Sequence, residues 1–246
     1  MSPGRLIAAF ATALLVVAGL GYALSQTVLA RQPLAVADRP AYVEAPRPAA
    51  TLAPQPNAPA APTRVDPAWV ERTAARAGIP APAVRAYANA QLAEPRGCRV
   101  GWTTLAGIGW VESQHGTIGG RTLGADGHAS TPVIGPALDG KRFAAIPATP
   151  ESSAWHGDPV WDHAVGPLQF IPSTWDTWGT DGDGDGVADP NDIDDAAMSA
   201  ARYLCADGHD LASGAGWADA VFSYNHSQSY IDDVYAAATA YAERTD

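Results

Sequence analysis

Prolines restrict the fold of this chain more than any other feature of its sequence, because eight of them fall within residues 32–64. Proline fixes φ and lacks an amide donor, so at this spacing neither a helix nor a sheet can propagate. The stretch is also rich in alanine and has no apolar periodicity with which to build a core. We therefore expect a disordered Pro/Ala-rich linker over 32–65 and one globular domain over 66–246.

An uncharged apolar run precedes the linker. It extends from Leu6 to Leu24, nineteen residues that are enough to cross a bilayer as a helix. Residues 1–31 are therefore expected to form an N-terminal apolar helix that acts as a signal-anchor or a signal peptide. Val28-Leu29-Ala30 matches the small-residue cleavage pattern poorly, which favours an uncleaved anchor. The domain that follows is expected to be exported, and to stay at the membrane unless the segment is cleaved.

Charge and cysteine usage limit the partners of the domain. With 15 basic and 26 acidic residues the net charge is −11, which argues against binding nucleic acid or anionic lipid through a basic surface. Cys98 and Cys205 are the two cysteines and lack a metal-type pair spacing. Because the domain is expected outside the cytoplasm, a disulfide between them is favoured over two buried free thiols.

Helical periodicity is the main pattern after residue 65. Asp66 followed by Pro67 is typical of a helix start, and Gly78 is typical of a helix end. Further helices are expected at about 82–94, 101–114, 193–206, 217–225 and 230–244, with a short one around Trp175 and Trp178. No segment alternates as a strand would, so the domain is predicted to be mainly α. Its C-terminal core is expected to include Leu204, Val221, Phe222, Ile231, Val234 and Tyr235.

Residues 117–165, which we call the excursion, show little periodicity and contain many Gly, Pro, Asp and His residues. An irregular segment of this length in a compact domain is usually functional or disordered. Trp155 and Trp161 within it favour a binding role, since aromatic faces pack well against the C–H faces of sugar rings. Core packing is the alternative for each of them.

An aspartate-rich segment follows the Gln169 region and has the spacing of an EF-hand loop. Carboxylates occupy loop positions 1, 3, 5, 9 and 12, Gly186 stands at position 6, and a backbone carbonyl is available at position 7. Asp192 replaces the usual glutamate at position 12, which shortens its reach. We expect a structural Ca²⁺ ion, bound by Asp181, Asp183, Asp185, Val187, Asp189 and Asp192.

Glu112 is the one glutamate in a segment that the sequence predicts to be buried. Leu105, Ile108 and Glu112 share a helix face, so the carboxyl group lies among core-forming side chains. Burial and the nearby helix C-terminus both disfavour ionisation, and a raised pKa suits a general acid. A glutamate hydrogen-bonded at a helix end is the plainer interpretation. A di-iron site built on Glu112 and His115 lacks the second Glu-x-x-His pair that it needs.

Four segments in order resemble the membrane-bound lytic transglycosylase B family of peptidoglycan-degrading enzymes. They are Trp110-Val-Glu-Ser-Gln-His-Gly116, Gly166-Pro-Leu-Gln-Phe-Ile-Pro172, the aspartate loop, and Ser223-Tyr-Asn-His-Ser227. The resemblance implies a lysozyme-like helical domain that cleaves the β-1,4 bond between N-acetylmuramic acid and N-acetylglucosamine and leaves a 1,6-anhydro end. Two other outcomes remain open: a hydrolytic muramidase, and a wall-binding module without activity.

The same resemblance assigns roles to single residues. Glu112 is the catalytic acid and base, and Gln169 and Asn225 hold sugar. Tyr224, which lies beside the acid, and Ser113, which is adjacent to it, are expected to contact the substrate as well. The sequence departs from the family pattern in having Gly-Pro-Leu-Gln and Ser-Tyr-Asn-His-Ser, which bears on the binding of flanking sugars. Most glycosidases use two carboxylates. The excursion offers four candidates for a second one, which are Asp126, Asp139, Asp158 and Asp162.

Overall fold

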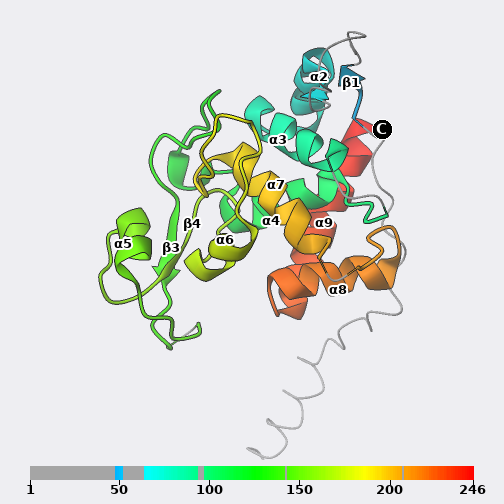
Figure 1. The fold of residues 1–246 in the computed structure, drawn as a ribbon. Coiled ribbons are helices and arrows are strands. Elements are labelled where there is room, and N and C mark those ends of the chain that lie inside the picture. The colour runs from blue at the N-terminus through cyan, green and yellow to red at the C-terminus, as the bar shows by residue number, and fades with distance from the viewer. Residues whose placement is uncertain (1–47, 52–63, 94–96, 142, 207) are drawn as a thin grey trace, which may run out of the picture. The chain divides into compact units, whose positions relative to one another are not determined.

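A computed structural model describes residues 48–51, 64–93, 97–141, 143–206 and 208–246, which all belong to one compact unit, Pro40–Asp246 (Figure 1). The predicted anchor and most of the predicted linker lie outside these residues. Among the helices that are described, none is both long and apolar enough to cross a membrane.

The described residues are mainly helical, as the periodicity predicts. The first helix begins where Asp66 accepts a hydrogen bond from the amide of Ala68, and it ends at Gly78 with a φ of 71°. The other predicted helices also form, with boundaries shifted by a few residues. The eight α-helices of the described part are α2 (Pro67–Ala77), α3 (Ala81–Leu92), α4 (Trp102–Ser113), α5 (Pro150–His156), α6 (Pro172–Trp178), α7 (Ile193–Leu204), α8 (Gly214–Tyr224) and α9 (Gln228–Thr245).

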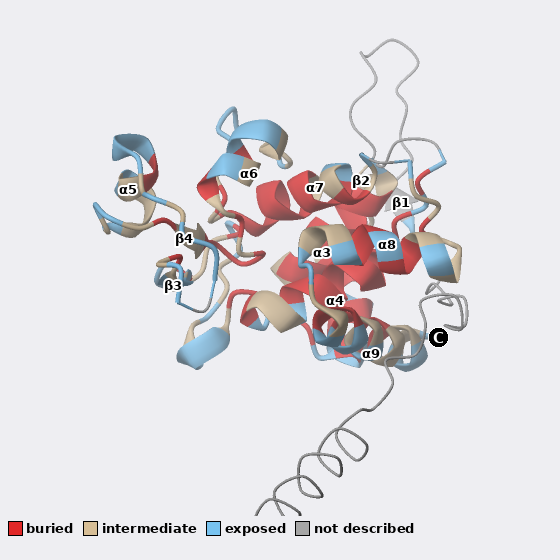
Figure 2. Ribbon diagram, turned by 90° about the horizontal axis from the view of Figure 1, so that it is seen from below, coloured by how far each residue is buried: buried red, intermediate tan, exposed pale blue. Residues whose placement is uncertain are grey.

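Helix α4 runs through the core, where it packs against α3 and α9 (Figure 2). Trp102, Leu105 and Ile108 of α4 are fully buried. Gly107 permits the close approach to α9, because a Cβ at this position would lie only 2.8 Å from the carbonyl oxygen of Val234. The helix that carries Glu112 is therefore fixed by packing contacts on several sides.

The predicted C-terminal core is largely confirmed. Leu204, Val221, Ile231 and Val234 are buried, and Tyr235 is partly exposed. Phe222 is 43% exposed, so its assignment to the core is wrong. It follows the buried Val221 directly, and successive residues of a helix point in directions about 100° apart.

The structure contains short strands that no alternating pattern in the sequence indicated. β1 (Ala50–Thr51) pairs antiparallel with β2 (Arg64–Val65), inside the range predicted as linker. β3 (Ile134–Ala137) pairs antiparallel with β4 (His163–Val165), and with α5 these strands lie to one side of the helices (Figures 1 and 2). The excursion thus contains one α-helix and two short strands. Its strand segment Ile-Gly-Pro-Ala gives no alternating pattern, which is why the sequence does not reveal it.

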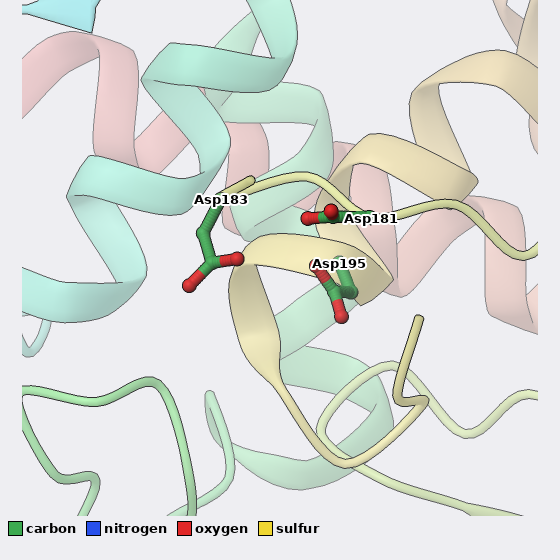
Figure 3. Close-up of side chains that lie close together, drawn as sticks. All are labelled: Asp181, Asp183 and Asp195. Atoms are coloured by element: carbon green, nitrogen blue, oxygen red, sulfur yellow. The ribbon is translucent and has the colours of Figure 1, made fainter. Parts of the chain in front are cut away.

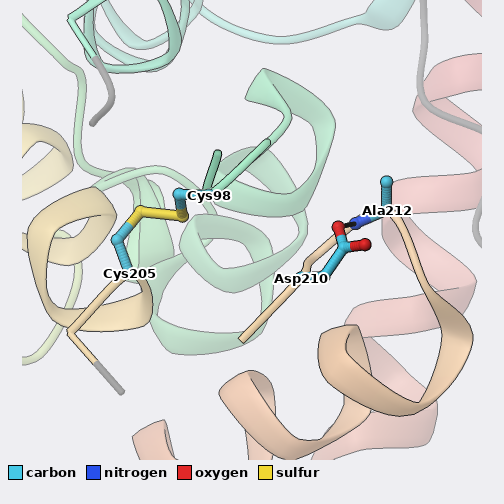
Figure 4. Close-up of a disulfide and its surroundings, with 4 residues drawn as sticks. All are labelled: Cys98, Cys205, Asp210 and Ala212. Carbon is cyan, nitrogen blue, oxygen red and sulfur yellow. Dashed lines mark hydrogen bonds between the residues drawn. A yellow bond between two sulfur atoms is a disulfide. The ribbon is translucent and has the colours of Figure 1, made fainter. Parts of the chain in front are cut away.

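Cys98 and Cys205 form the predicted disulfide (Figure 4). It joins the segment before α4 to the residue that ends α7, across a sequence separation of 107. The backbone nearby is tied as well, since the amide of Leu211 donates to the carbonyl of Cys98. The helix of Glu112 and the helix after the aspartate loop are therefore covalently linked near one end of each.

Candidate active site

Glu112 lies in the last turn of α4, which ends where Gln114 takes a left-handed conformation with a φ of 54°. The residue is half-buried. Burial of the carboxyl group raises its pKa to about 7, against the opposing effect of a hydrogen bond from Tyr230. The sequence-based expectation of a raised pKa thus agrees with the environment that the fold creates. A carboxyl group with this pKa exchanges a proton readily near neutral pH.

Tyr230 is the side chain that contacts the acid, and sequence reasoning missed it. Its hydroxyl donates to Oε1 of Glu112 at 2.6 Å. It lies in the first turn of α9, and α9 packs along α4, so the two side chains meet across that interface. An aromatic residue six positions after Tyr224 carries no local pattern that predicts this contact.

Tyr224 supports Tyr230 instead of bonding to Glu112. The two rings stack with 6.5 Å between centroids and an interplanar angle of 6°. The Tyr224 hydroxyl donates to the carbonyl of Leu168 at 2.9 Å, which links the end of α8 to the Gly166–Phe170 turn. Burial raises the pKa of both phenols well above the ordinary value, so both act as neutral donors.

Ser113 is fully buried and joins the end of α4 to the same turn. Its hydroxyl donates to the carbonyl of Pro167 at 2.5 Å and accepts from the amide of Gly116 at 2.7 Å. These contacts explain why a small hydroxyl residue follows Glu112. A direct contact of Ser113 with substrate stays a prediction.

His115 is buried between two phenol groups. Its Nδ1 lies 3.0 Å from the hydroxyl of Tyr87 and its Nε2 lies 2.9 Å from the hydroxyl of Tyr241. Burial lowers its pKa to about 3, so the ring is neutral. A Cβ on Gly109 would overlap the Tyr87 hydroxyl, which explains the glycine at that position. His115 therefore anchors the end of the helix.

Gln169 and Tyr224 line one small pocket. Gln169 has a φ of 51°, and its amide nitrogen donates to the carbonyls of Gly166 at 2.9 Å and Val133 at 3.3 Å. The pocket has a volume of about 120 Å³ and is lined by Gln169, Phe170, Ile171, Thr174, Tyr203 and Tyr224. Asn225 is exposed directly after α8. Two of the predicted sugar contacts thus share a pocket.

Each of the four aspartates of the excursion forms a hydrogen bond or an ion pair with a residue of the same segment. Asp162 is buried and accepts from Ser152 at 2.5 Å, and Asp139 pairs with Lys141 at 2.8 Å. Asp158 pairs with His163, and backbone amides together with that histidine lower its pKa. Asp126 accepts from the amide of His128. Within the described part of the chain, none of these hydrogen bonds and ion pairs involves Glu112.

The aspartate loop and the start of α7 bring three carboxylates together, and one of them, Asp195, was not predicted as a ligand. Oxygens of Asp181, Asp183 and Asp195 lie within 4.8 Å of one another (Figure 3). Asp195 is buried in the first turn of α7, where it accepts from the amides of Gly182 at 2.6 Å and Asp189 at 2.9 Å. Burial raises its pKa. This arrangement of hard oxygen donors fits a divalent cation.

The other predicted ligands have different contacts. Asp192 begins α7, where it accepts from the amide of Asp194 at 2.7 Å, and burial raises its pKa to about 6. Asp185 accepts from the amide of Val187, and Asp189 accepts from the amide of Asn191. An aspartate just before a helical pattern is a typical N-cap. Applied to Asp192, that rule starts the helix at this residue and places Asp195 in its first turn, directly after the loop, where it could have been predicted as a ligand.

Comparison with known families gives one match. Residues 151–222 match the family described as the transglycosylase SLT domain. The match spans α5 to most of α8, and so includes Gln169 and the aspartate loop but neither Glu112 nor Tyr224. No curated protein and no solved structure matches the chain. The match supports a transglycosylase of the lytic type, and the mainly helical fold is consistent with it.

Proposed function

We propose that this protein is a peptidoglycan lytic transglycosylase. In this proposal it cleaves the β-1,4 bond between N-acetylmuramic acid and N-acetylglucosamine during cell-wall turnover, leaving 1,6-anhydro-muramic ends. The observation that carries the proposal is the Glu112 carboxyl group, whose pKa of about 7 suits proton transfer in both directions. The SLT match over residues 151–222 supports the class of reaction.

One carboxyl group is sufficient for this reaction. Protonated Glu112 donates its proton to the glycosidic oxygen, and the bond from that oxygen to C1 of the muramoyl sugar breaks. The resulting carboxylate then takes the proton of the muramoyl 6-hydroxyl while O6 bonds to C1, so the acid is regenerated without water. Tyr230 donates to Oε1 of Glu112, which leaves Oε2 as the oxygen that exchanges the proton.

Gln169, Tyr224 and Asn225 are the proposed sugar contacts. The amide nitrogen of Gln169 is occupied by two backbone carbonyls, so its Oε1 is the atom available to a substrate N–H or hydroxyl. Tyr224 and Asn225 at the end of α8 supply further contacts, and Ser113 keeps the end of α4 against the Gly166–Phe170 turn.

The proposal includes a structural Ca²⁺ ion at the aspartate loop. Asp181, Asp183 and Asp195 would hold it, with Asp185, Asp189 and the carbonyl of Val187 as further donors from the loop. When bound, the ion would offset the charge of the acidic loop and tie it to α7. Asp192 is better explained as the cap of that helix.

We place the domain outside the cytoplasm, at the membrane through residues 1–31 or released if they are cleaved. The disulfide supports an oxidising compartment.

Release of soluble fragments from purified peptidoglycan tests the catalytic assignment. The wild-type protein is expected to release fragments, and Glu112→Gln is expected to lose at least about a thousandfold of that rate. Fragment release by Glu112→Gln at the wild-type rate would sink the assignment. Binding of peptidoglycan by the wild-type protein without release would instead identify a wall-binding module.

A further inference from the structure

His163 in β4 lies between two hydrogen-bond acceptors. Its Nδ1 is 2.7 Å from the carbonyl oxygen of Gly135 in β3, and its Nε2 is 3.2 Å from Oδ2 of Asp158. A carbonyl oxygen only accepts, so Nδ1 carries a hydrogen and donates it to Gly135. The side chain is only 13% exposed. His163 therefore fixes the backbone of β3 at one specific residue.

The neighbours of His163 hold its ring in place. Asp158 is itself fixed, because its other oxygen accepts from the amides of Val160 at 2.7 Å and Trp161 at 3.2 Å. The ring of His156 lies 4.8 Å from that of His163, and its Nδ1 accepts from the amide of Asp158. The orientation of His163 is thus set by the excursion and does not depend on substrate.

Gly135, which His163 holds, also contacts Gln169. A Cβ on Gly135 would lie 2.6 Å from Oε1 of Gln169, so β3 passes directly beside that amide. The amide nitrogen of Gln169 donates to Val133, two residues earlier in the same segment. Strand β3 and the residue before it therefore contact both ends of the Gln169 amide, whose nitrogen also donates to Gly166 at 2.9 Å.

We propose that His163 is a positioning residue for the glycan substrate. Its Nδ1–H···O=C bond to Gly135 keeps β3 where it orients the Gln169 amide, so that Oε1 faces the sugar. The inference rests on the proposed function, in which Gln169 binds glycan. Because His163 acts on a binding contact and not on Glu112, its loss is expected to raise KM and leave kcat nearly unchanged.

Two amide substitutions separate the two bonds of His163. The side-chain nitrogen of Asn lies close to the place of Nδ1, and that of Gln lies close to the place of Nε2. His163→Gln, which loses the Gly135 bond, is expected to raise KM for a soluble uncross-linked glycan strand about fivefold, the effect of one lost hydrogen bond. His163→Asn keeps that bond and is expected to stay within about twofold of wild type.

Gly135→Ala tests the contact between β3 and the Gln169 amide directly. Its methyl group would displace Oε1 of Gln169, so it is expected to raise KM as His163→Gln does, and Gln169→Ala sets the upper limit of the effect. Thr149→Ala is the matched control. It removes the N-cap of α5 in the same excursion and leaves the bonds of Asp162, His156 and His163 in place, so it should lower Tm and leave KM unchanged.

The outcomes separate this inference from the proposed function. Equal KM values for His163→Gln and His163→Asn, or an equal rise for Thr149→Ala, would overturn the positioning role. An unchanged KM for Gln169→Ala would overturn it as well. None of these results changes the expectation for Glu112→Gln, which tests the proposed function alone.

Discussion

At the scale of single residues, Glu112 must donate a proton and then accept one, and two opposing effects set its pKa. Burial favours the neutral acid, whereas the Tyr230 hydroxyl favours the carboxylate. The result, a pKa of about 7, lies well above the ordinary value of 4.5. A group with an ordinary pKa would be ionised at neutral pH and could not start the reaction as an acid.

The raised pKa predicts how stability depends on pH. The folded state binds the proton of Glu112 more tightly than the unfolded state, so this group costs nothing below its ordinary value of 4.5 and costs most above about 7. Glu112→Gln removes that cost. We expect it to be more stable than wild type at pH 8.5, by up to about 3 kcal/mol, and equal at pH 4. Urea unfolding at both pH values checks this, and a difference independent of pH would contradict it.

Tyr230→Phe tests the opposing effect. Without the hydroxyl the pKa of Glu112 should rise further, so the alkaline decline of kcat/KM should move to higher pH by about one unit. Tyr224→Phe is the control, because its hydroxyl bonds to Leu168 and not to Glu112. Profiles of kcat/KM against pH for the wild type, Tyr230→Phe and Tyr224→Phe measure the position of this decline. An unmoved or acid-shifted limb in Tyr230→Phe would show that the hydroxyl does not stabilise the carboxylate.

Sequence reasoning predicted a buried Glu112 with a raised pKa but not its contact with Tyr230, for a physical reason. The position of Glu112 follows from local periodicity along one helix. The position of Tyr230 depends on how α9 crosses α4, and no local pattern in either helix encodes that crossing.

At the scale of elements, the contact between α4 and α9 depends on Gly107. A methyl group there would meet the carbonyl oxygen of Val234 at 2.8 Å and force the helices apart. Gly107→Ala is expected to destabilise the fold by about 1–3 kcal/mol despite the better helix propensity of alanine. The midpoint of denaturant unfolding measures this, and an unchanged or increased midpoint would contradict the packing argument.

The aspartate loop predicts a specific response to calcium. Ca²⁺ should raise Tm of the wild-type protein, and Asp195→Asn should abolish most of the increase because Asp195 lies with Asp181 and Asp183. Asp192→Asn is the control, since Asn is also a good helix N-cap and should preserve the response. Thermal melts of the three proteins with calcium and with a chelator measure these responses. A full response in Asp195→Asn together with none in Asp192→Asn would restore the ligand set expected from the EF-hand spacing.

The elements also show which features the sequence can predict. Helices with clear starts, such as Asp66-Pro67, and with regular apolar spacing were predicted within a few residues. Strand β3 contains Gly and Pro, and its bonds come from β4 some thirty residues away, so its formation depends on tertiary contacts. The same holds for Asp195, which joins Asp181 and Asp183 only because α7 folds back on the loop.

At the scale of the molecule, the disulfide closes a long segment of chain. It spans 107 residues, a separation for which loop-closure entropy gives about 3–5 kcal/mol of stabilisation. A variant with serine at both Cys98 and Cys205 should lose about that much, by urea unfolding of unreduced proteins. Equal stability of the variant and the wild type would show that the bridge contributes nothing to the free energy of unfolding.

The central claim concerns the whole molecule acting on its substrate: one carboxyl group cleaves the glycan, and a hydroxyl of the sugar takes the place of water. The mass of the released muropeptides tests this most directly. Digestion of purified peptidoglycan is predicted to give muramic ends lighter by one water than those of a hydrolase, and Glu112→Gln should give none. Products with ordinary reducing ends would contradict the account and identify a muramidase.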